Sequence, residues 1–207
     1  MADNAILYGF RWQKQLGAGS TLQPLRKPVA SAYQAAPGAV NVDLNVGDPV
    51  KLVSDGTIAL CAAGDAVYGI VAGIAPFWDS VQKVMRLGNA LPGGTTYGTV
   101  VQRQSYVYVV PVGGQVFEVD CDDNVTATTF LTYQALIEEN CDVSINAVAG
   151  TARANPRLDI STHVTTQLPW RIVDIPKQDQ QDFTGNYVKL LVTCDKVQQA
   201  PFVTTGV

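Results

Sequence analysis

Short β-prone runs separated by turn residues are the feature that most limits what this chain can fold into. Residues 49–53 (Pro-Val-Lys-Leu-Val) are followed by Ser54-Asp55-Gly56 and then by 57–61 (Thr-Ile-Ala-Leu-Cys). Asp-Gly between two such runs is a strong local signal for a β-hairpin, because these residues tolerate the backbone angles of a tight turn. We therefore predict that 49–61 form two antiparallel strands.

The next strands are also indicated by β-prone runs that contain glycine or end at glycine. Residues 67–74 form a third β-prone run, and Gly69 and Gly73 inside it predict a bulge or a close approach of two backbones. Residues 105–112 are the most β-prone run of the chain, and Gly113-Gly114 after it predicts a tight turn into another strand. The spacing of these signals is typical of a fold built from many short strands.

Apolar and acidic side chains alternate in the run 115–121. Phe117 and Val119 fall on one face of a strand, whereas Glu118 and Asp120 fall on the other. Such a period of two predicts a strand with one face in the core and one face in water.

One short helix is expected within 126–139, where Phe130, Tyr133 and Ile137 recur at helical spacing. The 18 Gly and 11 Pro of the chain, with abundant Val and Thr, otherwise favour strands and turns over long helices. We predict a mainly β fold: a small barrel or sandwich of short antiparallel strands with an extended N-terminal arm. Further strands are expected over 81–87, 157–160, 170–175 and 187–194.

The first 40 residues differ from the rest, because Gly and Pro interrupt them while they still carry large apolar side chains. We predict an extended arm over 1–40 that lies either on its own body or on a neighbouring subunit. On this interpretation, deleting 1–35 leaves the body folded. The other predicted segments are a β-barrel-like core over 41–103, an acidic lobe or insertion over 104–156, and return strands with a C-terminal tail over 157–207.

Charge and hydropathy argue against several classes of protein. The net charge of −4 disfavours nucleic acid as a main partner, since phosphate contacts need clustered Lys and Arg. No stretch approaches the roughly 20 apolar residues that cross a bilayer. The first residues also lack the basic segment of a secretory signal. We therefore expect a soluble protein, made in a cytosol, with no nucleic acid and no membrane as partner.

Few residues of the sequence fall in patterns that are typical of catalytic or metal-binding sites. His163 is the single histidine, and no Gly-x-Ser-x-Gly elbow presents a serine, so we do not expect an enzyme or any catalytic residue. The run Asp120-Cys121-Asp122-Asp123-Asn124 opens like a calcium loop, but Val125 stands where that loop needs Gly. The four cysteines are scattered and are expected to be buried, reduced thiols. We expect no cofactor and no metal.

Three neighbouring stretches, 46–52 (Val-Gly-Asp-Pro-Val-Lys-Leu), 54–60 (Ser-Asp-Gly-Thr-Ile-Ala-Leu) and 63–73 (Ala-Gly-Asp-Ala-Val-Tyr-Gly-Ile-Val-Ala-Gly), carry a shared pattern. Together they resemble the small β-barrel segment of tailed-phage head decoration (cement) proteins, in which the pattern GDPV…SDG…AGD…YGVV recurs. The resemblance covers about residues 40–75 and rests on turn-and-strand motifs.

The resemblance implies a virion structural protein that is made in the host cytoplasm and binds the outer surface of the phage capsid. Such proteins act as trimers or dimers, contact the major capsid protein, stabilise the shell and need no cofactor. Two other functions remain open: another virion component, such as a tail or head-fibre protein, and a carbohydrate-binding β module. The residues that we expect to make the contact are Phe10, Arg11, Trp12, Lys14, Leu22, Leu25, Arg26 and Lys27.

Overall fold

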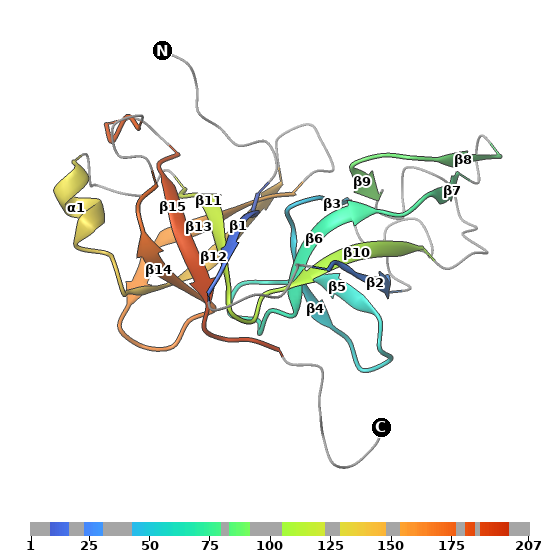
Figure 1. The fold of residues 1–207 in the computed structure, drawn as a ribbon, viewed down its shortest axis with the longest axis horizontal. Helices are drawn as coiled ribbons and strands as arrows, with labels where there is room; N and C mark the ends of the chain where they lie inside the picture. Colours follow the sequence, from blue (N-terminus) through green and yellow to red (C-terminus); the bar gives the residue numbers. More distant parts are fainter. Residues whose placement is uncertain are drawn as a thin grey trace.

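Two antiparallel sheets lie side by side along the long axis of the molecule (Figure 1). The structure is a computed structural model, and it describes residues 9–16, 23–30, 43–79, 83–91, 105–122, 129–147, 154–176, 181–184 and 187–198. The six-stranded sheet has the order β1 (Arg11–Gln15), β11 (Gln115–Asp120), β15 (Lys189–Cys194), β14 (Trp170–Asp174), β12 (Asn140–Ala147) and β13 (Ala154–Val164).

The five-stranded sheet has the order β2 (Leu25–Pro28), β10 (Tyr106–Pro111), β6 (Gly69–Ile74), β4 (Pro49–Leu52) and β5 (Ile58–Leu60). Two small ribbons accompany it, β3 (Leu44–Asn45) with β9 (Ala90–Leu91) and β7 (Phe77–Asp79) with β8 (Val84–Arg86). The β7–β8 ribbon projects at one end of the molecule, and the short helix α1 (Phe130–Gln134), the one helix of the described residues, lies at the other (Figure 1). The prediction of a mainly β fold with short antiparallel strands and one short helix is confirmed.

Each sheet curls until an end strand returns to the opposite side of the sheet: β5 meets the residue after β2, and β13 meets the residue after β11. In the five-stranded sheet, Val29 follows β2 and forms a parallel bridge with Ile58 of β5, where Ala30 N donates to Ile58 O at 2.8 Å. In the six-stranded sheet, Cys121 bridges Leu158 of β13. A single bridge is not a continuous ladder, so neither sheet is a closed barrel, and the architecture is sandwich-like.

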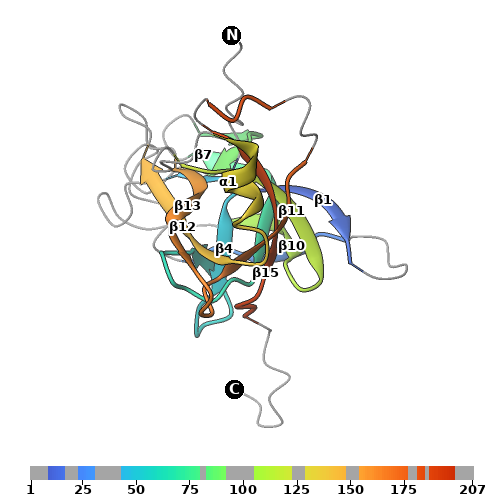
Figure 2. The ribbon, with the colours of Figure 1, turned by 90° about the vertical axis from the view of Figure 1, so that its left-hand side faces the viewer.

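Each sheet encloses its own hydrophobic core. The larger core lies in the six-stranded sheet and centres on Trp170 and Phe117, both fully buried. Figure 2 views this sheet end-on, with α1 at the near end, and Tyr133 of α1 is buried in the same core. The smaller core lies in the five-stranded sheet and includes Val29 and Ile58. The fold therefore has two packed cores, and strands β6 and β10 contribute to both: Ile70 and Val110 to the larger core, Val71 and Val109 to the smaller one.

The predicted hairpin over 49–61 is confirmed by the pairing of β4 with β5. Gly56 in its turn has a φ of 79°, which glycine adopts without steric cost. Asp55 Oδ1 accepts a hydrogen bond from Thr57 N at 2.9 Å and fixes the turn. Local turn chemistry thus determines this part of the fold.

The prediction that one face of β11 is exposed to solvent is wrong. Asp120 is 3% exposed and Asp122 is 8% exposed, and only Glu118 keeps partial contact with solvent. The reason is that β11 is an interior strand between β1 and β15, and β13 returns to its end, where Asp122 N donates to Leu158 O at 2.9 Å.

The N-terminal residues are part of the body rather than a separate arm, as far as the structure describes them. Residues 11–15 form β1 at the edge of the six-stranded sheet, and 25–28 form β2 at the edge of the five-stranded sheet. The predicted acidic segment 104–156 is likewise not one lobe, because it supplies β10 to one sheet and β11, β12 and β13 to the other. The predicted C-terminal tail lies outside the described residues beyond Gln198.

Gly69 shows the close backbone approach that its place in a strand predicts. A Cβ atom at this position would lie 2.3 Å from Val109 Cγ1 and 2.6 Å from the backbone oxygen of Val110. The register of β6 against β10 also shifts nearby, between Tyr108 and Val109. The two strands can be this close only because position 69 has no side chain.

Replacing Gly69 with Ala is expected to destabilise the protein by about 1–3 kcal/mol, because the added methyl group must displace backbone of β10. Urea unfolding measures this difference. Gly113→Ala is the matched control, since its Cβ would meet nothing within 4 Å. Equal midpoints for the two variants would contradict this packing.

Candidate functional site

Reactive groups do not converge in the described part of the chain. No three His, Cys, Asp or Glu side chains come together there in a way that could hold a metal ion. His163 lies exposed on β13, with its Nδ1 2.6 Å from Glu139 Oε2. No helix of the described residues is long and apolar enough to span a membrane.

The four cysteines are all buried and unpaired, which confirms the expectation of buried thiols. Burial is the largest cause of their raised pKa: it brings the pKa of Cys121 to about 11 and those of Cys141 and Cys194 to about 12. The pKa of Cys61 is also raised, chiefly by burial. Near neutral pH these groups are protonated thiols and poor nucleophiles.

The structure separates the predicted contact residues into a buried one and a set on two edge strands, of which all but the half-buried Lys27 are exposed. Phe10 is 3% exposed and its ring stacks on Trp170 with centroids 4.2 Å apart. Phe10 is therefore a core residue of its own chain, and its contact with a partner stays a prediction. Leu22 lies outside the described residues. The other six, Arg11, Trp12, Lys14, Leu25, Arg26 and Lys27, lie on β1 and β2.

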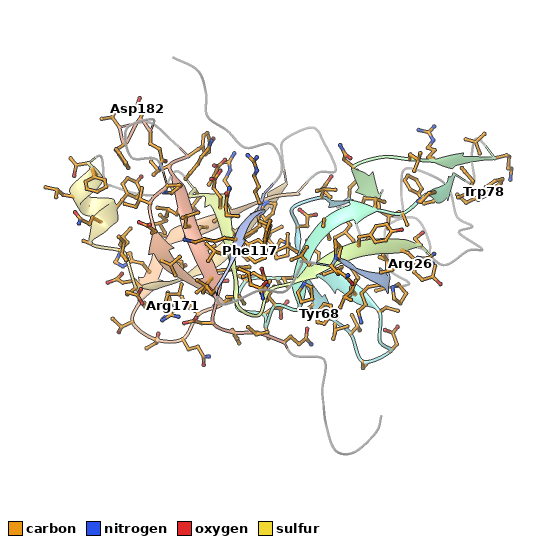
Figure 3. The ribbon with its side chains drawn as sticks, in the orientation of Figure 1. Arg26, Tyr68, Trp78, Phe117, Arg171 and Asp182 are labelled. Carbon is orange, nitrogen blue, oxygen red and sulfur yellow. The ribbon has the colours of Figure 1, made fainter. Side chains whose placement is uncertain are left out.

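None of the four basic residues on β1 and β2 forms an ion pair with a carboxylate of the described residues. Arg26 lies over the Tyr106 ring at 3.9 Å, and Lys27 Nζ is 5.1 Å from the centroid of the Tyr68 ring. Figure 3 shows Arg26 and Tyr68 in the half of the molecule that holds the five-stranded sheet. Glu118 is the cross-strand neighbour of Arg11, yet its Oε2 accepts from Gln13 Nε2 at 2.9 Å.

Ion pairs do occur elsewhere on the protein. Lys51 Nζ is 2.6 Å from Asp65 Oδ2, and Arg171 lies 3.3 Å from a carboxylate oxygen of Glu138 and of Asp195. The basic residues of the two edge strands therefore carry positive charge that the described carboxylates do not neutralise.

Large apolar side chains accompany these charges. Trp12 is 41% exposed, and its Nε1 donates to Gln115 Oε1 at 2.8 Å, which fixes the indole. Leu25 on β2 is exposed, and so is Tyr108, the cross-strand partner of Arg26. We call this set the edge surface. It comprises Arg11, Trp12, Lys14, Leu25, Arg26, Lys27 and Tyr108.

A groove of about 450 Å³ lies between the two sheets, beside β1. The strands β6, β10 and β11 supply its floor, and Phe117 among them lies near the middle of the molecule in Figure 3. We call it the inter-sheet groove. Its lining residues are Phe10, Arg11, Trp12, Val46, Ile70, Val71, Ala72, Val110 and Phe117.

Sequence reasoning missed this groove and a second feature, the apolar surface of the β7–β8 ribbon. Leu87 is 80% exposed, and Val84 and Met85 are exposed on the same ribbon. A strand was expected over 81–87, but a β-prone run does not reveal whether its side chains meet a core. No local pattern in the sequence indicates the groove, because the residues that line it come from segments far apart in the sequence.

No protein-family model, no curated protein and no solved structure matches this chain.

Proposed function

We propose that this chain is a virion structural protein that binds the outer surface of a phage capsid and stabilises the shell. The observation that carries the proposal is the edge surface: four basic residues that form no ion pair with a described carboxylate stand on the edge strands β1 and β2, which also carry the exposed Trp12 and Leu25. Trp, Tyr and Arg are the residues that contribute most to protein interfaces. The motifs that resemble decoration proteins form β4, β5 and β6, which support β10 and through it β2.

The major capsid protein is the partner under this proposal, and carboxylates on its outer surface would pair with the edge surface. Each exposed ion pair contributes only about 0.2–1 kcal/mol. Many copies on one lattice, assembled as dimers or trimers, would turn such weak contacts into firm attachment. The protein would be made in the host cytoplasm and act in the virion.

Co-sedimentation with expanded capsids that lack this protein tests the proposal. The wild-type chain is expected to bind, and binding should weaken as salt is raised, because salt screens exposed charges. Arg11→Gln with Lys14→Gln is expected to weaken binding about tenfold, from the loss of two ion pairs.

Lys83→Gln with Arg86→Gln is the matched control, because it removes the same charge from the β7–β8 ribbon. It is expected to bind like the wild type. Absence of wild-type binding at every salt concentration, or equal losses in the two variants, would contradict the proposal.

A carbohydrate-binding module is the second candidate, favoured by the exposed rings of Trp12 and Tyr108. Neutral sugars stack on aromatic faces and carry no charge, so binding of a neutral sugar would survive both high salt and the loss of Arg11 and Lys14. A tail or head-fibre protein would use the same edge surface, but would sediment with tails or fibres rather than with capsids.

A further inference from the structure

We propose that the inter-sheet groove receives a peptide segment of the partner protein in which a bulky apolar side chain stands next to an acidic residue. This inference rests on the proposed function, because it names the chemistry that the capsid partner would present. It also goes beyond the edge surface, since the groove is a concave site that shares only Arg11 and Trp12 with that surface.

The lining of the groove selects an apolar occupant. Its volume of about 450 Å³ falls in the range of small ligand pockets, roughly 300–1,000 Å³. All but one of its described lining residues are apolar, and Ile70, Val110 and Phe117 form a buried floor. Filling such a site with a large aliphatic or aromatic side chain removes apolar surface from water, which favours binding.

Because Arg11 is positively charged, it favours an occupant of the groove that carries a negative charge. It is the only ionisable side chain among the described lining residues, and it forms no ion pair with a described carboxylate. An acidic group at the mouth of the groove would pair with its guanidinium beside an apolar wall, where the interaction is stronger than in open water. The occupant therefore combines an apolar body with an adjacent anion.

The rim of the groove is held in place before any partner arrives. The hydrogen bond from Trp12 Nε1 to Gln115 Oε1 fixes the indole at 2.8 Å, and Phe10 N donates to Gly47 O at 2.9 Å. Fixing both residues lowers the entropy lost on binding. Because β1 ends the six-stranded sheet, an extended peptide can also lie along its outer edge.

The exposed apolar side chains that the structure describes on a second copy of this chain do not offer the required chemistry. Of its described exposed large apolar side chains, none is adjacent in sequence to Asp or Glu. Those on β8 stand next to Lys83 and Arg86, which have the same charge as Arg11. Because these side chains do not fit the groove, we take its occupant to be a segment of a different protein.

Binding of 8-anilinonaphthalene-1-sulfonate, an apolar body with one anionic group, tests the site itself. The folded wild-type protein is expected to enhance its fluorescence saturably. Ala72→Leu places a side chain in the groove and is expected to abolish this binding, whereas Arg11→Gln should weaken it roughly fivefold, as the loss of one exposed ion pair implies. Lys14→Gln removes a cation of β1 that does not line the groove, and should bind like the wild type.

Three capped tetrapeptides then test the occupant by displacing the dye. Acetyl-Ala-Phe-Asp-Ala-amide is expected to displace it, and the same peptides with Lys in place of Asp, or Gly in place of Phe, are not. Displacement by all three peptides or by none overturns the inference, and dye binding with no peptide displacement would identify a site for small apolar acids instead. Dye binding that persists in Ala72→Leu also overturns it.

Co-sedimentation with capsids distinguishes a failure of the groove proposal from a failure of the proposed capsid-binding function. Ala72→Leu keeps every cation of the edge surface, so it is expected to bind capsids more weakly than the wild type but still in a salt-dependent way. If the wild type binds capsids and Ala72→Leu binds equally well, the groove proposal fails while the proposed function stands. If the wild type does not bind capsids, the proposed function fails first.

Discussion

Deleting residues 1–30 is expected to unfold the protein, in contrast to the prediction from sequence that the body stays folded without its first 35 residues. The deletion removes β1 and β2, the end strands of both sheets. It also removes Val29, which is fully buried and joins the two ends of the five-stranded sheet through Ile58. Phe10, which packs on Trp170, would be lost from the larger core.

Phe10→Ala tests the same claim with one side chain. Truncating a buried Phe typically costs about 3–5 kcal/mol, because it removes apolar contact and leaves a cavity. Leu25→Ala is the matched control at an exposed position of the same N-terminal segment, and should change stability by less than about 0.5 kcal/mol. Thermal and urea unfolding followed by circular dichroism measure both. A truncated chain that unfolds cooperatively at the wild-type midpoint would contradict this account.

The stability of the wild-type protein is expected to fall as pH rises from about 5 to about 8, in part because of Asp48. Burial is the main cause that raises the pKa of this carboxyl group from 3.8 to about 8, against the opposing effect of hydrogen bonds from Asn45. Asn45 N donates to Asp48 Oδ2 at 2.7 Å, whereas Oδ1 has no hydrogen-bond partner in the described structure. The residue is 1% exposed and belongs to the Gly-Asp-Pro-Val motif.

The direction of the pH effect follows from proton linkage. Between these two pKa values the folded state binds the Asp48 proton more tightly than the unfolded state, so raising the pH favours unfolding by up to about 1.4 kcal/mol per pH unit. Below the unfolded pKa the contribution is fully present, and it is lost as pH passes through the folded pKa.

Asp48→Asn is expected to flatten this dependence and to be more stable than the wild type at pH 8, because Asn carries no charge and its side-chain oxygen still accepts from Asn45. Urea unfolding at half-unit pH steps measures the slope. Asp55→Asn is the control, since the pKa of Asp55 is lowered and the group stays ionised over this range. Parallel slopes for the wild type and Asp48→Asn would show that Asp48 titrates normally.

Sequence reasoning succeeded where structure is encoded locally. The turn at Asp55-Gly56 needs only its own residues, and Gly69 marks a close approach that no other residue permits. The short helix was expected within 126–139, and α1 lies there at Phe130–Gln134. Each of these signals acts over a few residues.

Sequence reasoning failed where strands that are far apart in the sequence pair with each other and so decide the fold. The Gly and Pro residues of the first 40 positions suggested an arm, yet β1 pairs with β11 about a hundred residues later. Pro28 is accommodated because β2 is an edge strand, where a missing N–H is tolerated. Likewise, alternation in β11 could not show that a neighbouring strand would cover Asp122.

Sequence reasoning identified the basic residues of the candidate site, but it did not predict which of the aromatic residues beside them are buried. The basic residues at 11, 14, 26 and 27 were recognised by their type. Their position on edge strands explains why Arg11, Lys14 and Arg26 are exposed and Lys27 is only half-buried. Phe10 looked equivalent to Trp12, because both are large aromatic residues in the same segment. Their opposite burial arises from the pleat of β1 and from Trp170, which is 160 residues away in sequence.

Backbone hydrogen exchange of the protein, free and bound to expanded capsids that lack it, tests the central claim most directly. If the edge surface is the contact, amides of 11–16 and 25–27 are expected to exchange more slowly in the bound state, whereas those of α1, at the far end of the molecule, stay unchanged. Protection that appears at α1 and leaves β1 and β2 unaltered, or a failure to bind the capsids at all, would contradict the account.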